Sequence, residues 1–332
     1  MTHSKGSKTK YLLRLFLAVI IIINLIFAYL YYLTQPISSN SSPKIFNITS
    51  GQSVSLIAKN LKQEKLIRSD IAFKLLYYIK DRQGLIDGSY SLSGNMRLSD
   101  IIDLTSNGKT SKIQVTLLEG KRSDDLIKQL AVATKVDQAT LKEEFLHNST
   151  SAIVNERADK NSIEGYIFPD TYSFNVGSSY QDIVGKIYQN TQNKFSSLDF
   201  NGSSLSFNQA LILASIVEKE AMTIKDRKMV AQVFLNRLDI NMPLQSDVTI
   251  DYITGHQVTT PEDIDIDSPY NTYKNKGLTP TPICNIGLEA IEAVLKPIAN
   301  DYIFFLADKN GVVHYSKTLE QHNSNIELYL NH

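Results

Sequence analysis

The feature that most constrains this chain is an uncharged and almost wholly apolar run near its N-terminus, Leu15–Leu33. A run of about 18–20 apolar residues is long enough to cross the hydrocarbon core of a bilayer as a helix. Four cations and no acidic residue precede the run, and the cations are Lys5, Lys8, Lys10 and Arg14. Positive charge of this kind marks the cytoplasmic side of a membrane segment. The sequence therefore predicts a cytoplasmic tail over residues 1–14, one membrane-spanning helix and an extracytoplasmic remainder.

A cleaved signal peptide is the competing interpretation of the same run. However, the run is longer than the usual apolar region of a signal peptide, and no clear A-x-A cleavage site follows it. Tyr29, Tyr31 and Tyr32 lie at its end, where aromatic side chains favour the lipid–water boundary. We therefore expect an uncleaved single-pass anchor in the cell membrane, in contact with the lipid bilayer through residues 15–33.

The composition excludes several classes of function. The chain has 332 residues, of which 42% are hydrophobic, so it can bury a sizeable core and form about two domains. Its formal net charge is zero, which argues against a general nucleic-acid partner. Cys284 is the single cysteine, so neither an internal disulfide nor a CxxC metal site can form. His314 and His322 lack the HExxH spacing of a zinc site, and we expect neither a metal nor a cofactor.

A small subdomain is predicted after a polar linker over residues 34–44. Its pattern indicates a strand at Ile45–Ile48, a helix over about Ser53–Gln63, a second helix after Ser69 and a strand near Gly88–Leu92. This βααβ order, with "SGQSVSLIA" after the first strand, resembles a LysM module, a small fold that grips N-acetylglucosamine polymers. The alternative is a small packing domain that binds nothing, because the resemblance depends mainly on element order. We assign residues 45–112 to this LysM-like subdomain.

The remainder, residues 113–332, is predicted to form a mixed α+β catalytic domain, so that the chain as a whole is of the α+β class. A strand at Ile113–Leu118 is followed by a glycine and a helix that repeats the pattern of the first subdomain. The aromatic segment "EGYIFPDTYSF" over Glu164–Phe174 is too polar for an inner strand and too aromatic for an idle loop. A helix over about Tyr180–Phe195 follows it.

The segment "LILASIVEKE" carries the candidate catalytic group. Ser206 is a suitable N-cap for a helix from about Asn208 to Met222, and a helix that is apolar on every side is normally buried. Glu218 and Glu220 stand at its end, about 200° apart around the helix, so they cannot form a facing acid–base pair. Burial and the negative helix C-terminus both raise a carboxyl pKa, which suits a general acid. The alternative is a helix that simply reaches solvent, with a lysine screening two ordinary carboxylates.

Polar and aromatic residues after this helix are typical of a sugar-binding cleft, in which rings stack on sugar faces and amides pair with hydroxyl groups. The first stands at the end of a predicted helix over about Asp226–Leu238, and the others fall in turn-rich stretches. The candidate binding residues are Asn236, Gln245, Asp247, Tyr252, Asn271 and Tyr273. Any one of them alone is more often an ordinary turn residue.

Several motifs in this order resemble the YceG family of membrane-anchored endolytic murein transglycosylases. They are "ASIVEKE", "VFLNRL", "LQSD", "PYNTY", the loop Gly277–Gly287 and the closing stretch "YIFFLADKNGVVHYSKTLEQHN". The resemblance runs from the anchor to the end and is strongest over Ile163–Asn323. The loop departs from the family pattern at Thr279, Thr281 and Ile286, where the family tends to carry a different Gly- and Pro-rich sequence.

The resemblance implies that Glu218 is the catalytic residue. It implies a non-hydrolytic cut of the β-1,4 bond between N-acetylmuramic acid and N-acetylglucosamine, leaving a 1,6-anhydro-muramic end and ending strand elongation. Asn236, Gln245, Tyr252, Asn271 and Tyr273 would bind and position the strand. Asp247 would do the same and is the second candidate for the acid. The expected partners are peptidoglycan glycan strands and cell-wall synthesis proteins.

Two other functions remain open from the sequence. One is a muramidase that uses water, which differs only in its product and needs a second carboxylate. The other is a non-catalytic wall-binding anchor that holds glycan through the LysM-like part and leaves strand length unchanged.

Overall fold

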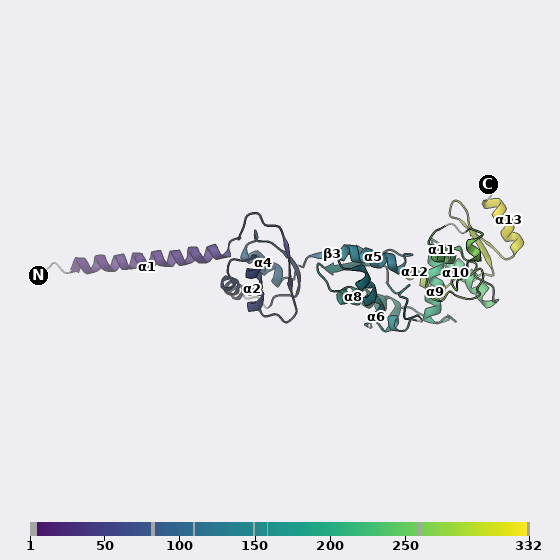
Figure 1. The fold of residues 1–332 in the computed structure, drawn as a ribbon, viewed down its shortest axis with the longest axis horizontal. Helices are drawn as coiled ribbons and strands as arrows, with labels where there is room; N and C mark the ends of the chain where they lie inside the picture. Colours follow the sequence, from purple (N-terminus) through teal and green to yellow (C-terminus); the bar gives the residue numbers. More distant parts are fainter. Residues whose placement is uncertain are drawn as a thin grey trace. The chain divides into compact units, whose positions relative to one another are not determined.

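The computed structural model describes residues 5–80, 84–108, 110–148, 150–157, 159–257 and 260–330, so residues 1–4 of the predicted cytoplasmic tail lie outside it. The chain divides into two compact units (Figure 1). Unit 1 comprises Met1–Ile113 and Phe174–Ser178, and unit 2 comprises Gln114–Ser173 and Ser179–His332. Helices and short two-stranded sheets occur in both, which confirms the predicted α+β class. The finer domain limits given above stay predictions.

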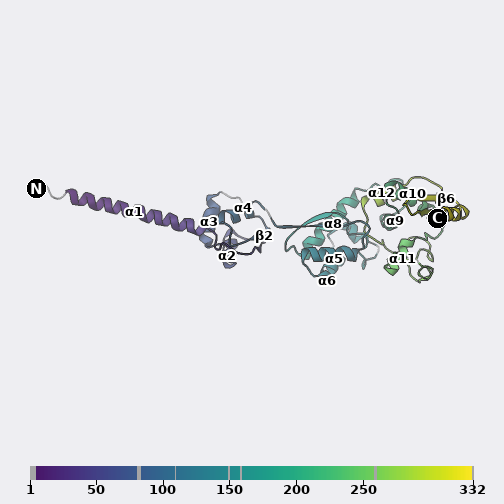
Figure 2. The same ribbon diagram turned by 90° about the horizontal axis from the view of Figure 1, so that it is seen from above.

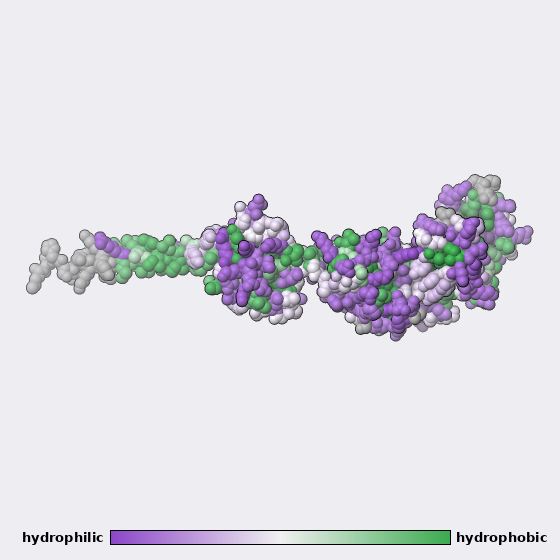
Figure 3. All heavy atoms as spheres, in the orientation of Figure 1, coloured by the Kyte–Doolittle hydropathy of each residue, from purple (hydrophilic) through white to green (hydrophobic). Residues whose placement is uncertain are grey.

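Helix α1 (Lys5–Thr34) contains the apolar run. Within it, Leu13–Thr34 has a mean hydropathy of 2.5, and none of its most apolar window is buried by protein. Figure 3 shows this stretch as a continuous hydrophobic surface. It is the one helix among the described residues that is long and apolar enough to cross a membrane.

Unit 1 forms the expected βααβ order. Its strands pair antiparallel, from Lys44 opposite Leu92 to Ile48 opposite Gly88. Both helices begin at serine N-caps, because the Ser53 and Ser69 hydroxyls each accept a bond from a backbone N–H three residues on. The second helix starts after Ser69 as expected. The elements after α1 are β1 (Lys44–Ile48), α2 (Val54–Gln63), α3 (Asp70–Ile79), β2 (Gly88–Leu92) and α4 (Leu98–Ser106). Their buried side chains form one apolar cluster.

Unit 2 begins on β3, which pairs with β4 in a two-stranded sheet. Its helices pack in two groups: α5, α6 and α8 contact one another in sequence, whereas α9 contacts α10, α11 and α12. Figure 2 shows the same elements from a second direction. The first group comprises β3 (Lys112–Thr116), α5 (Ser123–Thr134), α6 (Gln138–His147), α7 (Ala152–Asn155), β4 (Thr171–Asn175) and α8 (Tyr180–Ser196). The second comprises α9 (Phe207–Glu220), α10 (Ile224–Asp239), α11 (Asp247–Thr254), η1 (Asp263–Asp265), α12 (Leu288–Leu295), β5 (Phe304–Ala307), β6 (Val313–Ser316) and α13 (Leu319–Tyr329).

Helix α9 is the centre of the second group. Every residue from Ala210 to Val217 is buried, as the apolar run predicts for a central helix. Its start is fixed by a capping box in which Ser206 and Gln209 exchange side-chain-to-backbone bonds. The Ser215 hydroxyl, the polar side chain in the middle of the run, donates to Ile212 O and accepts from Ile283 N at 2.9 Å. That bond holds the loop before α12 against α9.

Strands β5 and β6 form an antiparallel C-terminal hairpin, from Phe304 opposite Ser316 to Ala307 opposite Val313. Within it, the His314 ring stacks on Tyr329 at 3.6 Å between centroids, and its Nε2 lies 3.1 Å from Asp308 Oδ2. This histidine therefore packs and pairs inside the hairpin.

Candidate active site

Helix α9 delivers Glu218 and Glu220 to the end of the apolar core. The two carboxyls contact different neighbours, as their spacing around the helix requires. Glu218 Oε1 accepts a bond from Arg227 at 2.7 Å, and Glu218 Oε2 accepts one from the Gly287 backbone N–H at 3.3 Å. Glu220 Oε1 instead accepts a bond from the Ser246 hydroxyl at 2.5 Å. Glu218 is thus separated from the second glutamate by the helix itself.

The environment of Glu218 favours its protonated form. Only 4% of its side chain is exposed, and burial raises its pKa to about 7. The Arg227 guanidinium and the Gly287 N–H act in the opposite direction, whereas the charges of Glu119 and Glu289 raise the pKa further. Burial outweighs the ion pair here, because a desolvated carboxylate loses more than one partner returns. A carboxyl of this kind can give and take a proton near neutral pH.

Arg227 organises the surroundings of this acid. Its guanidinium bonds three groups: Glu218, Ala221 O at 3.0 Å and Glu289 Oε2 at 3.2 Å. It thereby joins α9, α10 and α12 around one buried charge. Nothing in the sequence pattern indicates a role for Arg227, since one arginine on a helix carries no distinctive local signal.

Glu119 is a second residue near the acid that the sequence pattern does not indicate. It is exposed, and its carboxylate lies directly against Gly287: a methyl group added to that glycine would lie 2.0 Å from Glu119 Oε1. Gly287 is also the donor to Glu218, so the glycine leaves room for one carboxylate while its N–H bonds the other. A glycine opposite a glutamate in this way cannot be found from spacing, because the two residues are far apart in the chain.

Asn285 links the segment of Glu119 to the segment of Gly287. It is fully buried, and its amide Nδ2 donates to Lys121 O, Ser123 Oγ and a Glu164 carboxylate oxygen at 3.0–3.1 Å. Its backbone exchanges bonds with the same segment, since Gly120 N donates to Asn285 O at 2.8 Å and Asn285 N donates to Lys121 O at 2.9 Å. These bonds hold the loop after β3 beside the loop before α12.

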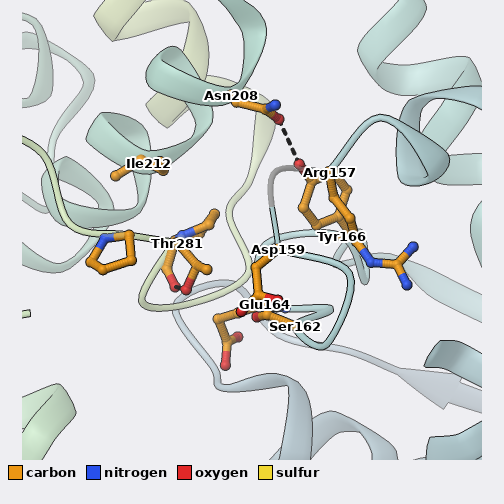
Figure 4. A pocket seen from close by; sticks show the side chains of 10 residues that line it. Arg157, Asp159, Ser162, Glu164, Tyr166, Asn208, Ile212 and Thr281 are labelled. Carbon is orange, nitrogen blue, oxygen red and sulfur yellow. Dashed lines mark hydrogen bonds between the residues drawn. The ribbon is translucent and has the colours of Figure 1, made fainter. Parts of the chain in front are cut away.

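Glu164, from the aromatic segment, completes this network. Its Oε1 accepts bonds from the Ser123 backbone N–H at 2.8 Å and the Ser123 hydroxyl at 3.0 Å, at the first turn of α5. Burial raises its pKa to about 7. Figure 4 shows it beside a small cavity of about 10 Å³, where the Tyr166 hydroxyl donates to Asn208 at 2.7 Å. A space of that size holds about one water molecule and leaves no room for a larger ligand. We therefore assign the Glu164 carboxyl a structural role.

A larger cavity of about 320 Å³ adjoins the candidate acid. Gly120 and Lys219 lie in its wall, and a methyl group at Gly120 would stand 4.0 Å from Glu218 Cγ. Its lining residues are Gly120, Lys121, Arg122, Asp125, Lys219, Val248, Asp251, Tyr252, Gly255, His256, Gln257 and Ile283. Mixed charges, the Tyr252 ring and the Gln257 amide around one cavity suit a polar ligand with apolar faces.

The lining of this cavity contains one of the six candidate binding residues, Tyr252. Its ring lies 4.6 Å from the Arg122 guanidinium and 5.0 Å from the Tyr270 ring. Asp247 is exposed at the start of α11 and accepts a bond from the Tyr273 hydroxyl at 2.5 Å. Asp247 and Tyr273 therefore form a hydrogen-bonded pair near Glu220. The negative charge of Asp247 helps to raise the pKa of the Glu220 carboxyl.

The other three occupy different settings. Asn236 Nδ2 donates to Asn300 O and Tyr302 O, and these bonds hold α10 to the segment just before β5. Asn271 is fully buried, and its Nδ2 donates to Ile264 O at 2.9 Å and Ile266 O at 2.8 Å. Gln245 is exposed in a left-handed conformation (φ 45°). Direct contact of any of the six residues with a ligand stays a prediction.

The profile of the YceG-like family matches residues 46–328. This chain belongs to the YceG-like family. The match takes in every site residue described above, and it confirms the family resemblance of the sequence motifs.

Known YceG-like relatives extend over most of the chain. A Bacillus subtilis (strain 168) protein named endolytic murein transglycosylase is 37% identical over 318 residues, which are 90% of this chain and 88% of the relative. A Streptococcus pneumoniae (strain D39) protein of the same name is 29% identical, and the match spans 92% of this chain but 62% of that relative. The 2.6 Å crystal structure of a YceG-like protein from Listeria monocytogenes superposes with a TM-score of 0.58 at 33% identity, covering 86% of this chain and 99% of that one.

The loop that departs from the YceG pattern is stabilised by its own residues. The Thr279 hydroxyl donates to Thr281 O at 2.8 Å, and the Thr281 hydroxyl bonds the Tyr270 hydroxyl at 2.8 Å. Ile286 is fully buried. Hydroxyl bonds and an apolar anchor thus hold the loop that ends at the Gly287 N–H.

Proposed function

We propose that this YceG-like chain is an endolytic lytic transglycosylase of peptidoglycan. The observation that carries the proposal is the setting of Glu218: one carboxyl, almost fully buried, with its pKa raised to about 7 beside a polar cavity. The relatives named endolytic murein transglycosylase support the same reaction class.

Glu218 acts first as general acid and then as general base. It gives its proton to the oxygen of the β-1,4 bond as the bond from the muramic C1 to that oxygen breaks. The resulting carboxylate takes the proton of the muramic C6 hydroxyl as O6 bonds to C1. No water enters, and the products are a free 4-hydroxyl and a 1,6-anhydro end. Ordinary glycosidases need a second carboxylate for water or for a covalent intermediate, whereas here the sugar's own hydroxyl replaces both.

The charges around the acid match the two halves of this cycle. The Glu119 and Glu289 carboxylates favour the protonated form before the cut. Their negative charge also stabilises the positive charge that develops at C1 in an oxocarbenium-like transition state. Arg227 and the Gly287 N–H stabilise the carboxylate that forms after the proton leaves.

Access to the carboxyl runs past Gly120. Since only 4% of the Glu218 side chain is exposed, the glycosidic oxygen must take the place of one present neighbour in the reactive complex. Gly120 lies in the cavity wall, and a side chain there would contact both Lys219 Cδ at 3.7 Å and Glu218 Cγ at 4.0 Å, so the glycine keeps the wall thin on this flank of the acid, as a close approach requires. Tyr252, Asp247 and Tyr273 bind the strand on the cavity side. Gln245 contributes an amide, and Asn236 and Asn271 act by positioning the segments around them.

The chain is anchored by Leu13–Thr34 with its N-terminus in the cytoplasm and unit 2 outside. The cations before the run, unopposed by acidic residues, support this orientation. It places the candidate acid on the side of the membrane where peptidoglycan is made, and cell-wall synthesis proteins are the expected neighbours.

Product analysis tests the proposal against its alternatives. Purified full-length chain is incubated with uncleaved glycan strands, and the fragments are weighed by mass spectrometry. Lytic transglycosylation predicts internal cuts with ends about one water lighter than hydrolysed ends. Hydrolysed ends would indicate a muramidase, and unchanged strand length would indicate a wall-binding anchor.

A further inference from the structure

Helix α3 carries an apolar stripe that no described part of the protein covers. Ile71, Leu75, Tyr78 and Ile79 follow one another at helical spacing, and their exposed fractions are 69%, 48%, 68% and 69%. The opposite face of the same helix, with Ala72, Phe73 and Tyr77, is buried in the core of unit 1. A helix that is apolar on both faces is unusual in a water-exposed domain, and such patches mark sites of interaction.

The start of α3 is tied to the end of the membrane-spanning segment. Arg68, which directly precedes the N-cap of α3, reaches back along the chain. Its Nη1 donates to the Tyr32 hydroxyl at 2.8 Å, its Nε to Gln35 O at 3.3 Å, and its Nη2 to Pro36 O at 2.5 Å. The guanidinium also lies 4.4 Å from the centre of the Tyr32 ring. One side chain thus joins the end of α1 to the beginning of α3.

Further contacts fix the same junction. Ile37 N and Ser38 N donate to Gly94 O at 2.8 and 3.0 Å, and Leu33 packs against the core cluster of unit 1. Helices α1 and α3 contact each other, and Figure 2 shows α3 beside the C-terminal end of α1. The stripe therefore begins within one side chain's reach of the point where the apolar segment ends.

We propose that the α3 stripe (Ile71, Leu75, Tyr78 and Ile79) lies in the interface of the lipid bilayer, so that unit 1 is seated on the membrane surface. Tyrosines at the end of α1 and on α3 would share the interfacial zone that aromatic side chains favour. The nearby cations Lys74 and Lys80 pair with Asp70 and Asp103, so apolar contact rather than anionic headgroups provides the attraction. This inference rests on the proposed membrane anchor.

The sequence contains no tryptophan, so a single introduced tryptophan reports on one position. Full-length Tyr78→Trp is reconstituted in phosphatidylcholine nanodiscs with and without brominated acyl chains. Phe27→Trp, within the apolar segment, reports insertion of the anchor. Met222→Trp, at a residue that is 93% exposed in unit 2, reports a side chain in water.

If the α3 stripe lies in the bilayer interface, the fluorescence emission of Tyr78→Trp should be blue-shifted relative to that of Met222→Trp. Brominated lipid should quench the Tyr78→Trp emission, but less strongly than that of Phe27→Trp. Adding Ile71→Asn and Ile79→Asn in the Tyr78→Trp background should reduce the quenching, and a matched pair of exposed changes, Val132→Asn and Ile240→Asn, should not. If Phe27→Trp is quenched while Tyr78→Trp behaves like Met222→Trp, the anchor holds and the seating is wrong. If Phe27→Trp is also unquenched, the anchor is wrong and the seating falls with it.

Discussion

Arg227 Nη2 bonds Glu218 Oε1 at 2.7 Å, and 9% or less of either side chain is exposed to solvent. A buried ion pair usually keeps its carboxylate ionised, yet burial raises the pKa of this one to about 7. Burial therefore favours the protonated form of this acid, and the Arg227 guanidinium favours the ionised form.

The first prediction concerns the pH dependence of cleavage. The free enzyme must hold its proton on Glu218 to act as general acid, so kcat/KM should be highest below about pH 7 and fall as pH rises through that value. Initial rates on isolated glycan strands between pH 5 and 9 measure it. A rate that rises steadily to pH 9 would assign Glu218 the role of an initial base instead.

The second prediction concerns Glu119. Its negative charge raises the pKa of Glu218, so Glu119→Gln should move the falling limb of the pH profile to lower pH. At pH 7.5 a loss of about a few-fold is expected, because an exposed charge is partly screened. Glu119→Asp, which keeps the charge, is the matched control and should keep the limb near its original place. An unmoved limb in Glu119→Gln would show that the two carboxylates do not interact.

The third prediction concerns Arg227 and has the opposite sign. The guanidinium lowers the pKa of Glu218, so Arg227→Gln should move the limb to higher pH. The variant should also lose about 3 kcal/mol of unfolding free energy, because it leaves Ala221 O and Glu289 without their donor. Urea unfolding and the pH profile measure the two effects separately. Arg227→Lys retains the charge and should lose stability with a smaller shift of the limb.

The fourth prediction concerns Glu220, whose carboxyl is bonded to Ser246 and has its pKa raised by burial from 4.5 to about 7. The folded state then holds this proton more tightly than the unfolded chain. Stability from this residue is therefore fully present below about pH 4.5 and is lost as pH rises to about 7. Glu220→Gln should flatten that part of the stability profile, measured by thermal unfolding at pH 5 and pH 8. Its glycan cleavage should fall much less than that of Glu218→Gln, and equal losses would contradict the assignment of roles.

How far the sequence predicts this molecule depends on how local each signal is. The apolar run of α1 and the serine-capped helix α9 follow from hydrophobic pattern and cap chemistry alone. Helix α9 lies close to its expected limits, whereas α1 ends where expected but begins at Lys5, ten residues before the apolar run. The βααβ order of unit 1 is predicted for the same reason. Short helices such as α11 were missed, because eight residues carry too little periodicity to stand out.

The surroundings of the acid could not be predicted in the same way. Glu119, Arg227 and Gly287 come from three distant segments, and only the folded chain brings them around Glu218. Amides raise a further difficulty, since an asparagine in a turn pairs with backbone carbonyls as readily as with a sugar. Asn271 is an example. Its residue type is typical of sugar-binding sites, but its side chain is fully buried and bonds the backbone of the neighbouring loop.

The central claim is that a single carboxyl, Glu218, carries both proton transfers. Glu218→Gln tests it most directly, because the amide keeps the shape and cannot cycle a proton. With folding checked by circular dichroism, and Lys225→Gln as an exposed control on α10, anhydro-ended fragments from glycan strands are counted by mass spectrometry. Glu218→Gln should lose activity by about 10²–10⁴-fold, and Lys225→Gln should change it little. Anhydro-ended fragments at the wild-type rate from a folded Glu218→Gln protein would contradict the single-carboxyl mechanism.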